Sequence, residues 1–281
     1  WSDELLKLFE IPLNCLPQLN PVISCYGHLK TLNIPLTCAC GDQNAALHAY
    51  PPLADNTVLV NIGTGAFILS TSDEKHYPRR LLRSIAHSQQ IEHQNIANYI
   101  TEGTVNGAGA ALSWKEQAHP VDNLFKLLPD WLNEIKSPPL FINTVAGLGS
   151  PWWNSASNPK LIACKSHHTI AEEYVDIIES IVFLIFYNLQ ELAQSTDTLL
   201  LSGGLSQLDG LCQKLADLSS IKIIRYRECE SSARGCAWLS KQLLTNNEEW
   251  RPLPVEKTFS PIKNDLLVNR YQQFVGELKK L

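Results

Sequence analysis

The stretch TVLVNIGTGAFILST, residues 57–71, decides the fold of this chain. Its two β-rich runs, 57–62 and 66–71, flank Gly63-Thr64-Gly65, which predicts a hairpin whose glycines take positive φ at the tight turn. A third strand is predicted near 97–101, followed by a helix of small residues over 105–117. Antiparallel strands therefore begin the predicted sheet.

Further along the chain, helices and strands are predicted to alternate. An insert holds a strand at 140–145 and a loop at 146–155, and a long helix follows over 169–192. That helix carries one apolar stripe, at positions 174, 177, 178, 181, 185, 189 and 192. A strand at 197–202, a helix at 206–218, a strand at 221–226 and a helix at 231–245 come next. This order predicts an α/β domain with a mixed sheet and helices on both faces.

The N-terminal 50 residues have a different character. A short helix is predicted over 2–9, and three prolines then interrupt regular structure. A strand over 36–40 leads into Gly41, and Asp42 occupies the N-cap position of a helix over 43–50, which Pro51-Pro52 ends. A domain boundary is predicted there. The C-terminal tail from residue 251 is proline-rich and closes with a helix over 264–279.

Composition narrows the class of protein. The chain has 281 residues, a formal net charge of −5, 44% hydrophobic and 18% charged residues. This balance disfavours a disordered chain and a basic nucleic-acid binder. The apolar run 180–189 is too short to cross a bilayer, so no membrane span is expected. Eight scattered cysteines indicate reduced thiols in the cytoplasm, without disulfides.

Several motifs receive structural interpretations. Nucleotide-binding GxxxxGK[ST] and GxGxxG, zinc HExxH and nucleophilic GxSxG motifs are absent from the sequence. Cys38 and Cys40 lie two residues apart on the predicted strand, so their side chains point to the same face. Because there is no second pair at zinc spacing, they are interpreted as buried thiols and no metal site is predicted. His167-His168, near Cys164, is interpreted as an exposed pair. The cluster Arg79, Arg80 and Arg83 is interpreted as a solvated hairpin edge.

Three glycine-marked turns suggest a ligand site. Gly63-Thr64-Gly65, Gly107-Ala108-Gly109 and Gly203-Gly204 each stand at a strand–strand or strand–helix junction. Backbone N–H groups at glycines can approach an anion closely, so together these turns favour a phosphate-binding loop, although each alone is also typical of an ordinary turn. Asp42 is either a helix cap or a ligand-contacting carboxylate with Gln43 beside it, and the two roles are compatible.

These residues resemble the FGGY carbohydrate kinases, and most of all their glycerol kinase-like branch. The resemblance rests on motifs that occur in the family's order: CGDQNAAL (40–47), NIGTGAF (61–67), EGTVNGAGAALSW (102–114), AGLGSPWW (146–153), LSGGLSQ (201–207), ESSARGCAWLS (230–240) and FSPIKNDLLVNRYQQF (259–274). It covers nearly the whole chain but only about the second half of the family's usual length. It implies an actin-like ATPase (ribonuclease H-like) fold, with 1–50 as the tail of one actin-like domain and 51–281 as the next.

The resemblance also implies a function and its residues. It implies ATP-dependent phosphoryl transfer, with Mg²⁺, to a hydroxyl of a small polyol or sugar. By position, Asp42 matches the catalytic base, Gln43 and Phe67 match residues of the polyol site, Thr64 and Gly65 match the loop that holds the ATP phosphates, and Gly109, Gly203 and Gly204 match nucleotide contacts.

The sequence departs from the family pattern at two positions. Ser202 stands where the family has an acid, and Leu208 stands where a nucleotide-contacting Asn is expected. These changes support an alternative, a non-catalytic kinase-derived module that binds a nucleotide or a partner. Because the first half of the family's length is not in this sequence, these 281 residues alone are expected to show weak or no turnover. The exposed apolar cleft face of such a half would also favour a homo-oligomer.

Overall fold

The structure is a computed structural model that describes residues 1–50, 53–54, 56–72, 78–162, 167–192, 195–227, 230–244 and 253–281. It divides into two compact units. Unit 1 comprises 1–49, 85–98 and 231–250, and unit 2 comprises 50–84, 99–230 and 251–281. The predicted helix end at Pro51-Pro52 and the predicted position of Cys164 lie outside the described residues. The division into domains 1–50 and 51–281 stays a prediction.

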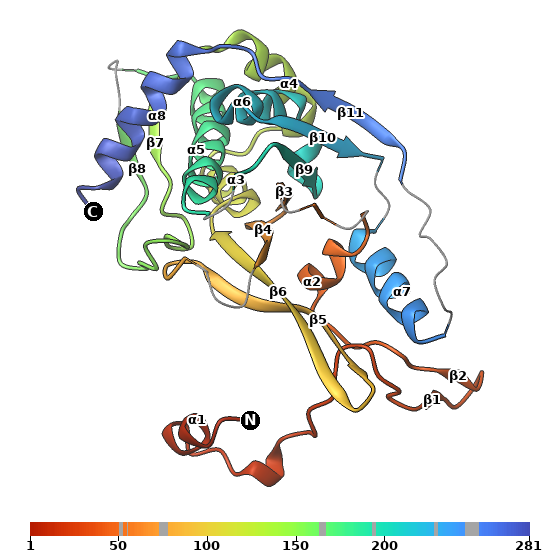
Figure 1. Cartoon of the computed structure of the whole chain (residues 1–281). Helices are drawn as coiled ribbons and strands as arrows, with labels where there is room; N and C mark the ends of the chain where they lie inside the picture. The colour runs from red at the N-terminus through yellow and green to blue at the C-terminus, as the bar shows by residue number, and fades with distance from the viewer. Residues whose placement is uncertain are drawn as a thin grey trace. The chain divides into compact units, whose positions relative to one another are not determined.

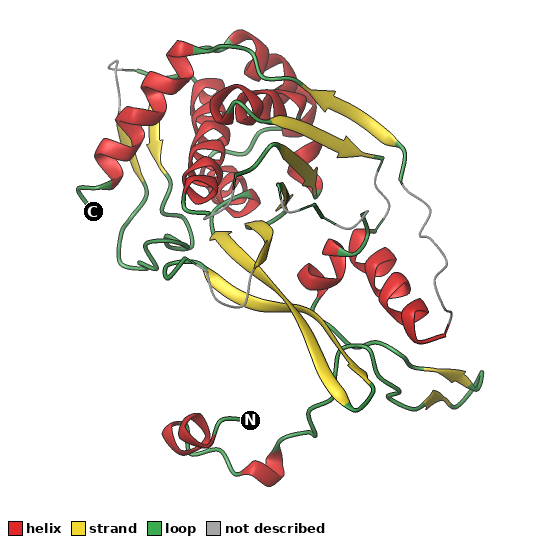
Figure 2. Cartoon of the chain, viewed as in Figure 1, coloured by secondary structure: helices red, strands yellow, loops and turns green. Residues whose placement is uncertain are grey.

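Unit 2 contains most of the helices and strands of the chain (Figures 1 and 2). Its strands are β3 (Thr57–Ile62), β4 (Ala66–Ser72), β7 (Leu140–Ile142), β8 (Lys160–Ile162), β9 (Thr198–Ser202), β10 (Lys222–Tyr226) and β11 (Val255–Phe259). Its helices are α3 (Gly109–Ala118), α4 (Leu124–Glu134), α5 (Ile170–Gln190), the 3₁₀ turn η2 (Gly204–Gln207), α6 (Asp209–Ser219) and α8 (Asp265–Leu278). The hairpin of β5 (Leu82–Ile91) and β6 (Gln94–Val105) is shared between the units.

The main sheet has seven strands in the order β11-β10-β9-β3-β4-β6-β5. β3, β9 and β10 run parallel, whereas β4, β6 and β11 pair antiparallel with their neighbours. The predicted α/β class with a mixed sheet is therefore confirmed. Because Val58 and Val60 join the helix-covered core while Leu59 is also fully buried, both faces of β3 are covered, as its almost continuously apolar sequence requires.

Helix α5 is the centre of the core of unit 2. Thr169 caps it with a capping box to Glu172, whose side chain returns to the Thr169 amide at 2.8 Å. All seven positions of the predicted apolar stripe are buried. Helix α5 packs on α4, α6 and β4, and α6 contacts β10 and β11 (Figure 1).

Several predicted elements differ from the structure. The helix predicted from 105 begins at Gly109, because Val105 still pairs with Ala66 in the sheet. The helix predicted from 206 begins at Asp209, after the turn η2. The strand predicted over 140–145 ends at Ile142. The strand predicted over 36–40 is wrong: that segment makes one isolated bridge, from Cys38 to Ile23.

Unit 1 consists of short elements: α1 (Asp3–Leu8), the 3₁₀ turn η1 (Leu13–Cys15), β1 (His28–Leu29), β2 (Ile34–Pro35), α2 (Asp42–Leu47) and α7 (Ser231–Leu244). Helices α2 and α7 pack against each other. Segment 22–27 pairs irregularly with 36–39, with hydrogen bonds such as Tyr26 N–H to Leu36 O at 2.8 Å. No helix in the described part of the chain is long and apolar enough to cross a membrane.

Candidate functional site

In unit 2 the three glycine-marked turns meet at one end of the sheet. Gly109, the first residue of α3, donates its N–H to Gly63 O at 2.9 Å, and a Cβ at Gly109 would lie 2.8 Å from that oxygen. A Cβ at Gly65 would lie 2.9 Å from Val105 O. These approaches leave no space for a side chain. We refer to residues 63–65, 108–110 and 203–204 as the glycine cradle.

The hydrogen bonds of the cradle determine which amides can reach a ligand. Thr64 O accepts from Ala108 N–H at 3.2 Å and from Ala110 N–H at 2.9 Å. These N–H groups at the start of α3 are therefore already hydrogen-bonded to a protein carbonyl. Within the described residues, the amides of Thr64 and Gly65 have no backbone acceptor outside the strand ladders. The exposed tip of the β3–β4 turn therefore offers the donors, and Gly109 supplies close packing.

The expectation of positive φ in the β3–β4 turn is wrong, because neither Gly63 nor Gly65 adopts it. Gly203 does, with φ +85°, and a Cβ there would lie 2.5 Å from Asn61 Oδ1 and 2.6 Å from Ile62 O. Its neighbour Gly204 faces open space, with no heavy atom within 4 Å of its Cβ position. Gly203 is thus required by the fold, whereas Gly204 leaves room for a ligand.

The two departures from the family pattern have structural explanations. The buried hydroxyl of Ser202 donates to Asn61 Oδ1 at 3.2 Å and ties β9 to β3. Leu208 is buried in the core, before the first turn of α6. Both side chains are committed to the fold. Asn61 is a site residue that sequence reasoning missed, although an Asn inside the apolar run TVLVNI was a usable signal.

Phe67 lies on β4 beside the cradle and is half-buried. It is in register with Asn61 on β3 and Thr104 on β6. Its chain neighbours Ala66 and Ile68 belong to the core cluster that includes α5, so Phe67 occupies the opposite sheet face. On β6, burial raises the pKa of Glu102, which accepts a long hydrogen bond from Thr104 Oγ1 at 3.5 Å.

Asp42 and Gln43 lie in unit 1, at the start of α2. Gly41, and not Asp42, occupies the N-cap position, which corrects the prediction by one residue. The exposed Asp42 carboxylate accepts the Gln43 N–H at 2.8 Å, and Asp42 O accepts from Ser232 Oγ at 3.0 Å. Gln43 is half-buried. Asp42 is therefore held by its backbone while its carboxylate stays accessible.

Helix α7 fixes the position of α2 through a very close contact. A Cβ at Gly235 would lie only 1.6 Å from Ala45 O, so the two backbones touch where Gly235 has no side chain. Arg234 Nε also donates to Ala49 O at 2.9 Å. The placement of Asp42 thus depends on α7, a helix that begins 189 residues later in the chain.

The predicted cysteine, histidine and arginine groups differ in how well their predicted exposure agrees with the structure. The interpretation of Cys38 and Cys40 as buried thiols on a strand is wrong, because both are half-buried and lie outside any strand. Cys236 on α7 joins them. His167 is exposed, but His168 is half-buried, so the prediction of an exposed pair is correct for the first histidine only. Arg79 and Arg80 are exposed as predicted, whereas Arg83 lies over the Tyr99 ring at 3.8 Å.

Comparisons with known proteins identify relatives of this chain. A family model described as the FGGY family of carbohydrate kinases, C-terminal domain, matches residues 58–240. The chain is 30% identical to glycerol kinase from Aquifex aeolicus over 93% of its own length and 56% of that protein. It is 28% identical to apulose kinase from Pectobacterium atrosepticum over 98% of its length and 58% of that protein. The chain thus spans a little over half of these relatives.

A solved structure shows the same fold. The crystal structure of Plasmodium falciparum glycerol kinase with ADP matches the whole chain and 59% of that protein, with a TM-score of 0.81 and 20% identity. The actin-like fold inferred from the motifs is thereby confirmed. The match of the family model over residues 58–240, together with this shared fold, establishes that this chain belongs to the FGGY family of carbohydrate kinases.

Proposed function

We propose that the protein catalyses ATP-dependent phosphoryl transfer to a hydroxyl of a small polyol or sugar. The observation that carries this proposal is the glycine cradle, in which three turns from distant parts of the sequence pack together at one end of the sheet. The relatives named glycerol kinase and apulose kinase support an acceptor of the size of a polyol or small ketose.

The cradle fits the phosphates of ATP. The amides of Thr64 and Gly65 and the exposed Thr64 hydroxyl supply donors, and the open space at Gly204 leaves room for the nucleotide. Donors fixed by packing stabilise developing charge without reorganising during transfer. Gly109 and Gly203 act through close packing that holds these donors in place.

The expected Mg²⁺ fits the cradle less well. The residues of the cradle offer neutral oxygens, and Ser202, directly before Gly203, stands where the family has an acid. Mg²⁺ in proteins usually takes one or two carboxylates besides phosphate. We therefore assign no protein ligand to this ion and no step that depends on one. Mg²⁺ bound to ATP would neutralise phosphate charge.

Asp42 is proposed to be the base. As the acceptor oxygen bonds to the γ-phosphorus, the bond from phosphorus to the β–γ bridging oxygen breaks, ADP leaves, and the hydroxyl proton passes to the Asp42 carboxylate. The exposed carboxylate, held by its own backbone, suits this role. Gln43 and Phe67 are proposed to contact the acceptor, by hydrogen bonding and by packing respectively.

A second candidate is a non-catalytic module that binds a nucleotide or partner. Ser202 and Leu208 favour it, since both side chains are buried in the fold where the family has polar nucleotide contacts. In both cases we propose a cytoplasmic protein, which the free thiols of the six described cysteines support. A homo-oligomer, and weak or no turnover by these 281 residues alone, remain part of the proposal.

The two candidates are separated by two measurements on the full-length protein. Calorimetric titration with Mg-ATP measures binding, and a coupled assay measures ADP release with and without a panel of glycerol, ketoses and other polyols. Acceptor-dependent ADP release supports the kinase. Binding of Mg-ATP without acceptor-dependent release supports a nucleotide-binding module. The absence of both binding and turnover contradicts the kinase and the nucleotide-binding module, and leaves a partner-binding module.

A further inference from the structure

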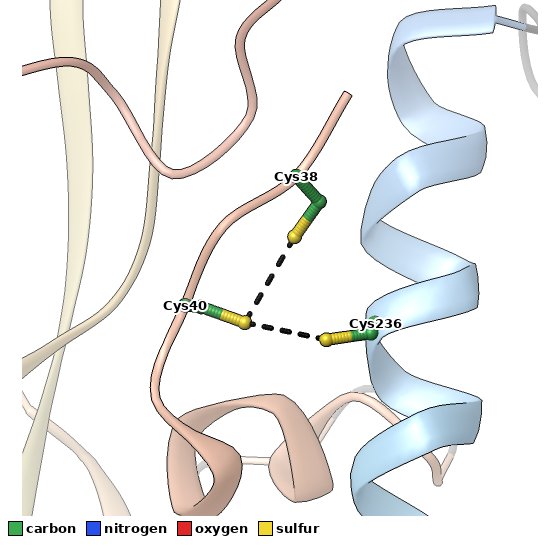
Figure 3. A group of neighbouring side chains, drawn as sticks. All are labelled: Cys38, Cys40 and Cys236. Carbon is green, nitrogen blue, oxygen red and sulfur yellow. Dashed lines mark hydrogen bonds between the residues drawn. The ribbon is translucent and has the colours of Figure 1, made fainter. Parts of the chain in front are cut away.

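Three cysteines in unit 1 form a compact cluster. Cys38 and Cys40 precede α2, and Cys236 lies on α7 (Figure 3). The Sγ atoms of Cys38 and Cys40 are 3.8 Å apart and those of Cys40 and Cys236 are 3.7 Å apart. All three sulfurs lie within 4.8 Å of one another and point toward a shared centre (Figure 3).

The sulfur–sulfur distances of 3.8 Å and 3.7 Å match those of thiolates around one cation. A metal–sulfur distance of about 2.3 Å in a tetrahedral site places neighbouring sulfurs about 3.8 Å apart. A disulfide instead joins only two sulfurs, at about 2.05 Å, and leaves the third without a role. Thiolates select soft cations, of which zinc is the most common structural example in proteins.

The backbone is built to bring these sulfurs together. Gly235, the residue before Cys236, lets α7 approach the Ala45 carbonyl so closely that no side chain would fit. Thr37, the residue before Cys38, donates its hydroxyl to Ser240 O on α7 at 3.1 Å. The cluster is therefore fixed from both sides, while its half-buried sulfurs stay within reach of solvent.

The surroundings of Cys38 and Cys40 disfavour the thiolate form. Burial raises the pKa of Cys38 and of Cys40, and the neighbouring cysteines raise that of Cys40 further. Both effects favour the protonated forms of Cys38 and Cys40. A bound cation would replace these protons and remove the repulsion between the sulfurs.

We propose that Cys38, Cys40 and Cys236 form a binding site for a thiophilic cation, Zn²⁺, with a water molecule as the fourth ligand. Such a site ties the segment before Asp42 to α7 and so holds the start of α2 in place. The proposal does not depend on the proposed kinase function, because it is tested by binding alone.

The test is a titration of the full-length protein, reduced with a phosphine and freed of metal, with Zn²⁺ in competition with a chromophoric chelator. One equivalent of Zn²⁺ is expected to bind. Cys38→Ser, Cys40→Ser and Cys236→Ser are each expected to weaken binding by on the order of 100-fold or more, since even lost outer-shell partners cost 10- to 100-fold. Co²⁺ in place of Zn²⁺ is expected to give sulfur-to-metal charge-transfer bands.

Matched controls are Cys15→Ser and Cys25→Ser, whose thiols are exposed and free; both should bind Zn²⁺ as the parent does. The proposal is overturned if the parent binds no stoichiometric Zn²⁺ or if the cluster variants bind it as tightly as these controls. Should a cluster variant not fold, alkylation of the parent decides: Zn²⁺ must protect Cys38, Cys40 and Cys236 while Cys15 and Cys25 react at unchanged rates. Equal reactivity with and without Zn²⁺ contradicts the site.

Discussion

Unit 2 and unit 1 hold their candidate functional residues in different ways. In unit 2 the glycine cradle lies at the end of strands whose side chains join one large core around α5, where almost every residue from Tyr174 to Ile185 is buried. In unit 1 few of the first 49 residues are buried, and large apolar side chains such as Leu8 and Phe9 are 70% and 65% exposed. The position of the cradle is thus fixed by many packing contacts, so no single contact determines it.

The position of Asp42 depends on far fewer contacts. Its helix has six residues and is positioned mainly by α7, through the close approach of Gly235 to Ala45 and the Ser232 hydrogen bond. The comparison indicates that single substitutions in unit 2 should act on the ligand or on global stability. In unit 1 they should act on the position of α2. The following predictions test that difference.

The largest effect is expected from Asp42→Asn. Removing the proposed base should lower kcat by roughly a thousandfold, while leaving ATP binding and the unfolding midpoint unchanged, because the carboxylate is exposed and accepts a hydrogen bond from the neighbouring Gln43 N–H, which an amide oxygen can also accept. Steady-state kinetics on the full-length protein, with calorimetry for ATP, measure this. Asp3→Asn, the same change in the first turn of α1, is the control, and parental turnover in Asp42→Asn would remove the base assignment.

Gly235→Ala should have the next largest effect. The added Cβ would lie 1.6 Å from Ala45 O, so the α2–α7 pair must separate, at a cost of about 3 kcal/mol. Hydrogen exchange is expected to accelerate in 42–47 and 231–244 but not in α5. Gly276→Ala, in a helix where nothing lies within 4 Å, is the control. If both variants exchange alike, α7 does not position α2 as argued.

Gly203→Ala and Gly204→Ala separate packing from binding in unit 2. At φ +85° and against Asn61, Gly203→Ala should lower the free energy of unfolding by about 2 kcal/mol. Gly204→Ala meets no protein atom, so it should leave stability within about 0.5 kcal/mol but weaken ATP binding about tenfold. Denaturant titration and calorimetry measure the two effects. Unchanged ATP affinity in Gly204→Ala would place the nucleotide elsewhere.

Local sequence signals predicted much of unit 2. Helix α5 was predicted within two residues at each end, because its cap and apolar stripe are both local. The strands β5 and β11 and the helix α4 were missed. β5 carries the polar run His-Ser-Gln-Gln and β11 has one buried side chain, Phe259, so neither shows the usual strand pattern. α4 does carry helical spacing, with Leu124, Leu128 and Leu132 buried on one face, but it also contains Pro129, which usually ends a helix. Pairing with neighbours or burial of one helix face decides these elements.

The glycines of the cradle could be found from the sequence, but the structural reason for each of them could not. Motif spacing identified the glycines, yet Gly65 is required by its close approach to Val105 O and not by positive φ, which is a property of tertiary packing. The partner of Cys40 was beyond reach of any local pattern, since Cys236 is 196 residues away. Spacing rules find metal ligands only when they are close in sequence.

The last prediction concerns Asp176, a buried carboxyl within unit 2 whose two oxygens have no hydrogen-bond partner among the described residues. Burial, with the charges of Glu173 and Glu179, raises its pKa from 3.8 to about 9, against the opposing effect of Lys115 and Arg270. Between these values the folded protein keeps a proton that the unfolded chain has lost. Raising the pH from 5 to 9 should therefore lower stability.

Asp176→Asn should flatten this dependence, because the amide resembles the protonated acid and does not ionise. The thermal midpoint of the variant should fall less than that of the parent between pH 5 and pH 9. Asp209→Asn is the control of opposite sign: although burial opposes ionisation there, hydrogen bonds from Lys257 and Arg225 lower the pKa of Asp209, so its loss should cost stability at neutral pH and little near pH 3. Parallel curves for the parent and Asp176→Asn would show that the core around α5 accommodates the ionised carboxylate. The contrast between the large core of unit 2 and the few contacts that hold α2 in unit 1 would then be weaker.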